Sequence, residues 1–265
     1  MKKFLKFLLF CFFVLVVYFG TLYFIQDDLL FYPEREYKSP ISAHLSEFSE
    51  HIIKTPDGVN IMTWYYQGDE NKPAILFLHG NAGQIATFAP YLFPYIREGY
   101  TVLMMEYRGF GNTRGTISQK AVVQDAASAF DWLKGRGYPK IIVYGYSFGT
   151  AFACALTEVR QPDGLILTSP FSSLDKLVSE KPVPFAQFAL KDAYRSVDYL
   201  KKYKAPLLII HGKKDTLIPY HHSQILFDNA LSQEKQIKLL DNETHTSIFF
   251  DQKNIPFILE FLKNF

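Results

Sequence analysis

The ten residues VYGYSFGTAF, from Val143 to Phe152, contain the pattern Gly-x-Ser-x-Gly centred on Ser147. The run KIIVYG before the serine predicts a buried strand, and the run SFGTAFACALTEV that begins with it predicts a helix. So tight a turn between strand and helix strains the serine backbone and exposes its hydroxyl. Gly145 and Gly149 are needed because side chains there would collide with the neighbouring strand and helix. The context therefore predicts that Ser147 is a nucleophile rather than an ordinary turn serine.

A serine hydroxyl needs a base to become nucleophilic, and the base needs an acid to orient it. Asp215 follows the strand-like run PLLIIHG, and His245 follows the next such run, IKLLD. The chain order Ser, Asp, His is the order that accompanies a Gly-x-Ser-x-Gly turn in one hydrolase architecture. Asp241 competes for the acid position because it stands close to His245. We interpret Asp241 as a turn residue, since the acid is expected at the end of the preceding strand.

The other six histidines are weaker candidates for the base. His79 and His211 each precede a glycine at a strand end, where local packing or hydrogen bonding is the expected role. His221 and His222 follow Pro219 at the start of a helical pattern and are expected on the surface. The remaining two, His44 and His51, precede the first glycine-rich turn of the chain.

The negative charge of a tetrahedral intermediate needs backbone N–H donors held about 3 Å away. One predicted donor is the N–H of Phe148, the residue after the nucleophile. The other is expected in the loop FLHGNAGQ, where Gly80 and Gly83 let the backbone turn towards a substrate. Within this loop we predict the N–H of Asn81, with Ala82 as the alternative.

Short apolar runs alternate with helical patterns from residue 74 onwards. The runs are nearly continuous in hydrophobicity, as expected of strands that are buried on both faces. The alternation predicts an α/β fold with a mostly parallel sheet flanked by helices, and the hairpin signal TPDG adds antiparallel strands at the start. The helical patterns cover residues 85–98, 118–133, 147–160, 220–231 and 255–263.

Residues 172–205 interrupt this alternation with an insertion between two strands. Its middle, PVPFAQFAL, is apolar and broken by prolines. An insertion at the carboxyl end of a strand commonly caps a site, so we predict a short lid here; the alternative is a lengthened crossover helix.

The N-terminus carries an apolar segment that is long enough to span a bilayer. Phe7 to Ile25 contains no formal charge and would reach about 28 Å as a helix. Lysines precede this segment and aspartates follow it, which predicts a cytoplasmic N-terminus and an extracytoplasmic remainder, periplasmic in a Gram-negative cell. We predict an uncleaved anchor over residues 1–27 and one domain over residues 28–265. A cleaved signal peptide, giving a secreted protein, is the alternative.

The overall composition restricts the possible partners. A net charge of +2 and the lack of a basic stripe give no support for nucleic-acid binding. Cys11 and Cys154 lie far apart and have neither C-x-x-C nor Cys/His metal spacing, so neither a disulfide framework nor a metal site is predicted.

Six segments together resemble the α/β-hydrolase superfamily: LHGNAG, EYRGFGNTRG, GYSFG, TSPFSSL, HGKKDTLIP and the NETH loop. They look most like its small membrane-anchored serine hydrolases, which include acyl-protein-thioesterase-like and serine-aminopeptidase-like branches. The resemblance implies an eight-stranded sheet with helices on both faces, a catalytic Ser-Asp-His set and a short helical lid. The chain departs from the family where Glu106 replaces the usual aspartate and where no glycine precedes His245.

These features predict a membrane-anchored serine hydrolase that cleaves acyl esters or thioesters without a cofactor. The apolar lid and the anchor favour acylated or lipid-like substrates. A serine aminopeptidase is the first alternative, and the lid offers acidic residues that could hold an amine: Asp175, Glu180, Asp192 and Asp198. A membrane-tethered binding module that has lost its chemistry is the second alternative. The sequence does not predict an oligomeric state.

Overall fold

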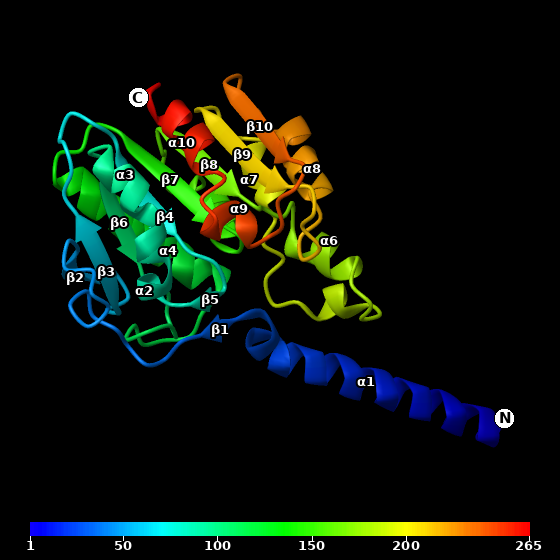
Figure 1. The fold of residues 1–265 in the computed structure, drawn as a ribbon. Helices are drawn as coiled ribbons and strands as arrows, with labels where there is room; N and C mark the ends of the chain where they lie inside the picture. The colour runs from blue at the N-terminus through cyan, green and yellow to red at the C-terminus, as the bar shows by residue number, and fades with distance from the viewer.

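An eight-stranded sheet forms the centre of the computed structural model, which describes residues 1–265 (Figure 1). The strand order is β10-β9-β8-β7-β4-β6-β3-β2, and only the pairs β2–β3 and β3–β6 are antiparallel. This confirms the mostly parallel eight-stranded sheet with an antiparallel hairpin. The strands are β2 (Ser49–Lys54), β3 (Asn60–Tyr66), β4 (Ala74–Leu78), β6 (Thr101–Met105), β7 (Ile141–Tyr146), β8 (Gly164–Thr168), β9 (Leu207–Gly212) and β10 (Lys235–Leu240).

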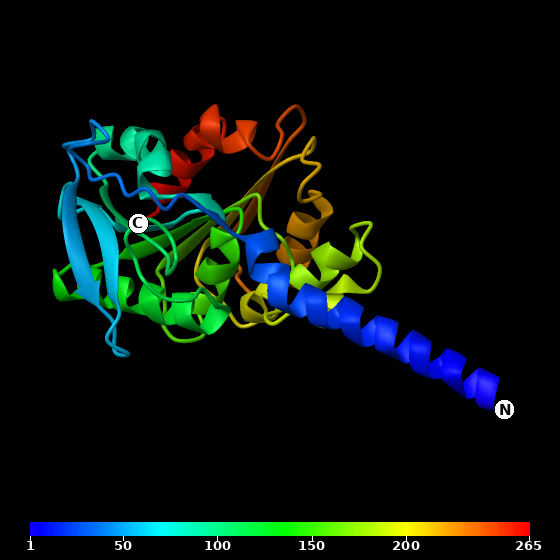
Figure 2. The same ribbon diagram turned by 90° about the horizontal axis from the view of Figure 1, so that it is seen from below.

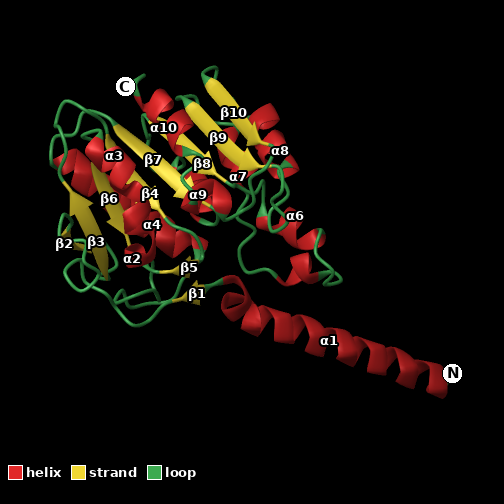
Figure 3. Cartoon of the chain, in the orientation of Figure 1, coloured by secondary structure: helices red, strands yellow, loops and turns green.

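Helices cover both faces of the sheet, as predicted (Figure 3). Alternate residues of one strand point to opposite faces, so Leu76 joins one hydrophobic core and Phe77 the other. The first core is closed by α4 (Gln119–Gly135), α5 (Gly149–Leu156), α7 (Ser196–Leu200) and α8 (His221–Asn229). The second is closed by α2 (Ile85–Phe88), α3 (Phe93–Arg97), α9 (Ser247–Phe250) and α10 (Ile255–Leu262).

The helix predicted over residues 85–98 is wrong in its continuity. The structure divides this segment into α2, a 3₁₀ turn η1 (Ala89–Leu92) and α3. Pro90 and Pro94 each stand in the first turn of a new element, where their missing N–H is tolerated. A proline in a continuous helix would break a backbone hydrogen bond, so the segment bends at both.

The N-terminal helix α1 (Lys2–Leu30) is a single rod that projects from the rest of the chain (Figure 1). Its side chains are mostly exposed and apolar between Phe4 and Ile25. By length and composition it is the one helix able to cross a membrane. It contains the whole predicted span and runs three residues past residue 27, the predicted end of the anchor. The division into an anchor and one domain stays a prediction.

The lid segment, residues 172–205, folds into α6 (Leu174–Ser179), the 3₁₀ turn η2 (Ala186–Ala189) and α7. η2 lies beside α1, and α6 packs against η2; Figure 2 shows this part of the chain next to the carboxyl-terminal half of α1. The Gln26 side chain joins α1 to the lid segment, since it donates to the Ala189 carbonyl (2.9 Å) and accepts from Lys191 N–H (2.8 Å). Just after α1, the short strand β1 (Tyr32–Pro33) pairs in parallel with β5 (Ala82–Gly83), which lies in the loop after β4. The helix is therefore attached to the rest of the chain at two places.

Candidate active site

Ser147 occupies a strained turn at the carboxyl end of β7. Its φ of 52° lies in the left-handed region, which a residue with a side chain adopts at a cost. A Cβ on Gly149 would lie 2.0 Å from the Leu78 carbonyl oxygen, and a Cβ on Gly145 would lie 2.6 Å from Thr150 Cα. Both glycines are thus required for the close approach of β7, α5 and β4, as predicted. The turn holds the Ser147 side chain at the edge of the sheet.

The structure brings the three residues Ser147, His245 and Asp215 into one hydrogen-bonded chain. His245 Nε2 lies 2.9 Å from Ser147 Oγ, and His245 Nδ1 lies 2.7 Å from Asp215 Oδ2. Each residue follows the carboxyl end of its own strand: Ser147 follows β7, Asp215 follows β9 and His245 follows β10. Parallel strands bring these ends to the same edge of the sheet, although the serine and histidine are 98 residues apart. Such a chain can pass a proton from the hydroxyl to the imidazole.

The Asp215 carboxylate is buried and fully engaged in hydrogen bonds. Burial acts to raise its pKa, but hydrogen bonds from His211, His245 and Ile218 N–H outweigh burial and hold the pKa well below the usual range. The carboxylate is therefore charged at neutral pH. Asp241, the competing acid, forms an ion pair with Lys213 (2.7 Å) at the surface and does not contact His245.

His211 makes hydrogen bonds close by in the sequence, as predicted, and one of them reaches the candidate acid Asp215. Its Nε2 lies 3.1 Å from Asp215 Oδ2 and 2.9 Å from the Ile218 carbonyl oxygen, while its Nδ1 lies 2.6 Å from Ser223 Oγ. A carboxylate and a carbonyl only accept, so Nε2 carries the proton and donates to both. His211 thereby holds the same carboxylate oxygen that faces His245. Its place four residues before Asp215 was the signal in the sequence.

The backbone N–H groups of Asn81 and Phe148 make no hydrogen bond within the protein. Both residues line the same cavity as Ser147, with a volume of about 440 Å³. Gly80 lies beside the nucleophile, since a Cβ there would be 3.6 Å from Ser147 Cβ. Two free donors beside a hydroxyl are the arrangement that stabilises a developing oxyanion.

The cavity beside Ser147 is lined mostly by apolar side chains from α1, the lid and the loop after β9. Its size is in the range of small-molecule sites. The lining residues are Leu29, Leu30, Tyr32, Asn81, Ser147, Phe148, Phe171, Leu174, Leu177, Val178, Lys181, Leu217 and Ile218.

Glu106, the departure from the family pattern, supports the loop that carries Asn81. Its carboxylate lies 3.0 Å from His79 Nε2 and accepts from Ile85 N–H at 3.0 Å. The Tyr107 hydroxyl donates to the His79 carbonyl (2.7 Å). All of these groups are buried, so Glu106 acts as a structural residue and does not contact Ser147.

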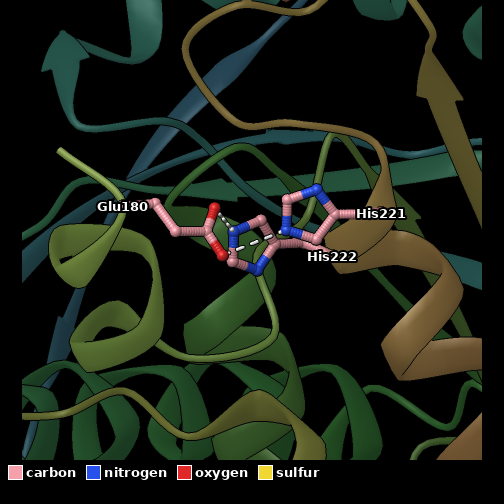
Figure 4. A group of neighbouring side chains, drawn as sticks. All are labelled: Glu180, His221 and His222. Atoms are coloured by element: carbon pink, nitrogen blue, oxygen red, sulfur yellow. Dashed lines mark hydrogen bonds and ion pairs between the residues drawn. The ribbon is translucent and has the colours of Figure 1, made fainter.

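Glu180, His221 and His222 form a second polar group, between the lid and α8 (Figure 4). The expected surface position is correct for His221 and wrong for His222, which is buried because the first turn of α8 directs it inwards to Ser172 Oγ (2.8 Å). The possible ligand atoms of the three residues lie within 4.8 Å of one another, a donor set that suits Zn²⁺. The sequence showed no metal spacing because the glutamate precedes His221 by 41 residues. Glu180 of the lid lies 3.1 Å from His221 Nε2 and 3.3 Å from His222 Nε2, so the group joins the lid to α8.

Comparisons with known proteins agree with the geometry. A family model described as the alpha/beta hydrolase fold matches residues 73–188, and a model described as serine aminopeptidase, S33, matches residues 175–253. The uncharacterised protein Rv2307c of Mycobacterium tuberculosis is 30% identical over 219 residues, which are 80% of this chain and 78% of that protein. The lysophosphatidylserine lipase ABHD12 of Rattus norvegicus is 30% identical over 236 residues, which are 73% of this chain and 59% of that protein.

Solved structures support the same fold. An esterase of Pyrococcus furiosus, Pf2001, superimposes with a TM-score of 0.72 at 24% identity, covering 89% of this chain and 98% of that chain. An esterase of Exiguobacterium antarcticum superimposes with a TM-score of 0.63 at 17% identity, covering 81% of this chain and 100% of that chain. On the family models, the relatives and the fold together, this chain is a hydrolase and belongs to the α/β-hydrolase superfamily.

Proposed function

We propose that this protein is a membrane-anchored serine hydrolase that cleaves acyl ester or thioester bonds through Ser147, His245 and Asp215. One observation carries the proposal: His245 lies within hydrogen-bonding distance of both the Ser147 hydroxyl and the buried Asp215 carboxylate. The strained serine turn and the free N–H groups beside it agree with this chemistry.

The reaction proceeds in two halves. Ser147 Oγ attacks the acyl carbonyl carbon while its proton moves to His245 Nε2, and Asp215 stabilises the imidazolium that forms. The N–H groups of Asn81 and Phe148 donate to the resulting oxyanion. The leaving alcohol or thiol takes the proton from His245 as the intermediate collapses to an acyl-enzyme. Water then attacks that ester by the same route, which releases the acid and restores the serine.

The lining of the cavity favours an acyl group with an apolar chain. Ten of the thirteen residues around it are hydrophobic, and Lys181 supplies the single formal charge. The names of two relatives, a lysophosphatidylserine lipase and an esterase, agree with an acyl ester as substrate. We therefore propose an acylated or lipid-like substrate.

We propose further that α1 is retained as an anchor, with the N-terminus cytoplasmic and the hydrolase domain outside. Lys2, Lys3 and Lys6 precede the apolar stretch, which supports this orientation. The bonds from Gln26 to the lid support retention, because cleavage within α1 would remove a packed part of the structure. Secretion after cleavage is the alternative.

A serine peptidase is the second candidate, and the match of residues 175–253 to the serine aminopeptidase model favours it. The acidic residues of the lid speak against amine binding, because each has a partner of its own and none lines the cavity at Ser147. Their partners are Arg195 for Asp175, Lys176 and His221 for Glu180, Gln119 N–H for Asp192, and Lys201 for Asp198. We therefore place the peptidase second.

Labelling with a fluorophosphonate tests the proposal directly. Wild type is expected to be labelled. Ser147→Ala is expected to lose labelling and at least about four orders of magnitude in kcat. Ser128→Ala, the control, is expected to keep the labelling and the kcat of wild type. Folded wild type that resists labelling would instead indicate a binding module. Comparing acyl esters with aminoacyl amides separates the two enzymes, and a strong preference for amides would exclude the esterase.

A further inference from the structure

The segment that ends α1 is built into the loop that carries Asn81. Tyr32 N–H donates to the Asn81 carbonyl at 2.8 Å, and Glu34 N–H donates to the Gly83 carbonyl at 3.0 Å. The Asn81 side chain in turn donates to the Leu30 carbonyl at the last residue of α1. The helix end and the residues just after it therefore bind the backbone carbonyl and the side-chain amide nitrogen of Asn81 and leave its backbone N–H free.

The same segment packs against the residue after the nucleophile. Phe31 is buried, and its ring centroid lies 4.8 Å from that of Phe148. Aromatic rings at this distance and tilt make a stabilising contact. The end of α1 thus touches both residues whose N–H groups face the reaction, so the helix has a fixed position relative to Ser147.

A second apolar groove, of about 250 Å³, lies between α1 and the lid. It shares Leu29, Leu30, Val178 and Lys181 with the cavity at Ser147, so the two spaces adjoin. Leu22 lines the groove on the α1 side away from Ser147. From Leu22 to Leu30 the helix rises about 12 Å, which sets the reach of the groove along α1.

The lid beside this groove presents an apolar surface. Phe185 and Phe188 are 63% and 74% exposed, and their rings stack with centroids 6.4 Å apart. The Tyr18 hydroxyl donates to the Pro184 carbonyl at 2.6 Å, which fixes this end of the lid against the apolar part of α1. Exposed aromatic side chains beside a helix of bilayer length indicate a surface that meets lipid.

We infer that α1 forms one wall of the substrate site, and that one acyl chain lies in the groove between α1 and the lid with its carbonyl at Ser147. The inference rests on the proposed function and adds the path of the substrate: its acyl chain enters from the bilayer between Leu22 and the lid. An acyl chain is the occupant that fits, because the groove is lined mostly by apolar side chains, adjoins the cavity that holds Ser147 and has as its wall a helix able to lie among lipid chains.

The test uses the full-length protein in detergent micelles and a series of acetyl, butyryl, octanoyl and palmitoyl esters. Leu22→Trp fills the groove away from Ser147. We expect kcat/KM for the palmitoyl ester to fall at least about tenfold, while acetyl and butyryl esters stay within about twofold of wild type. Leu15→Trp is the matched control, because Leu15 is exposed on the same helix and lines neither space.

Each failure has its own signature. If Leu22→Trp and wild type have the same chain-length profile while both react with the fluorophosphonate, the groove does not hold the chain and the inference is overturned. An equal loss for all four esters also overturns it. That result would mean that Leu22→Trp disturbs the fold, or that the groove holds a second protein copy or detergent rather than the acyl chain. If wild type neither reacts with the probe nor cleaves any ester, the proposed function itself fails.

Discussion

His211 Nε2 lies 3.1 Å from Asp215 Oδ2, the oxygen that also faces His245 Nδ1. Removing this donor in His211→Phe leaves the Asp215 carboxylate with less stabilisation, so its pKa rises. The acid then takes up its proton at a higher pH. We expect the acid limb of the kcat/KM profile to move to higher pH and kcat to fall about tenfold.

The pH profile of purified variants checks this. His211→Gln keeps an amide donor in reach and is expected to recover part of kcat, whereas His44→Gln, far from the site in sequence and without a side-chain hydrogen bond, serves as the control. An acid limb that does not move in His211→Phe would show that the histidine acts only in packing.

The side chain of Asn81 gives a second prediction. Asn81→Ala keeps the backbone N–H but loses the bond to the Leu30 carbonyl, so the loop is no longer fixed to the end of α1. A misplaced donor stabilises the oxyanion less well, and we expect kcat to fall about tenfold for short and long esters alike, with KM little changed. Asn112→Ala, at an exposed loop position, is the control. Unchanged kcat would mean that β1–β5 pairing alone positions the loop.

The sequence predicted those features that depend on local pattern and strand order. Ser147, Asp215 and His245 could be found because each follows an apolar run, and parallel strands bring the ends of such runs together. The role of His211 and the burial of His222 could not be read in this way, because they depend on which face of an element meets a neighbour. The bond from Asn81 to Leu30 joins a loop to the end of α1, and no periodicity encodes such a contact.

Gly149 gives a prediction about stability. In Gly149→Ala the new methyl group would lie 2.0 Å from the Leu78 carbonyl oxygen, and backbone must move to make room. We expect a loss of about 3 kcal/mol or more in the free energy of unfolding. Gly135→Ala meets no atom within 4 Å and is expected to stabilise the protein by about 0.5 kcal/mol. Unfolding curves of both variants check the contrast, and equal stabilities would contradict the tight turn.

His222 predicts how stability depends on pH. Burial lowers the pKa of its imidazole from 6.5 to about 4. Between these two values the unfolded chain binds a proton at this histidine and the folded protein does not. The free energy of unfolding is therefore expected to fall as the pH drops from about 6.5 to about 4. His222→Asn is expected to lose this contribution to the pH dependence of the free energy of unfolding. His221→Asn, at an exposed position, is expected to keep it. Parallel slopes in all three proteins would argue against a buried neutral histidine.

The orientation of α1 can be tested with introduced cysteines, because the two native ones are poor targets. Cys11 lies within the apolar helix, and Cys154 is buried, which raises the pKa of its thiol to about 12. Lys253 is exposed and forms no ion pair, so Lys253→Cys adds one reactive thiol to the hydrolase domain. Intact cells, or cells with a permeable outer membrane, are treated with a membrane-impermeant maleimide.

With the domain outside, Lys253→Cys is expected to be labelled before the inner membrane is opened, and Lys3→Cys only afterwards. The mass of the labelled protein then separates the two fates of the helix. A full-length mass supports the retained anchor that the contacts of Tyr18 and Gln26 with the lid suggest. Loss of the first twenty or so residues would instead indicate a signal peptide, and the groove beside Leu22 would then lack its wall.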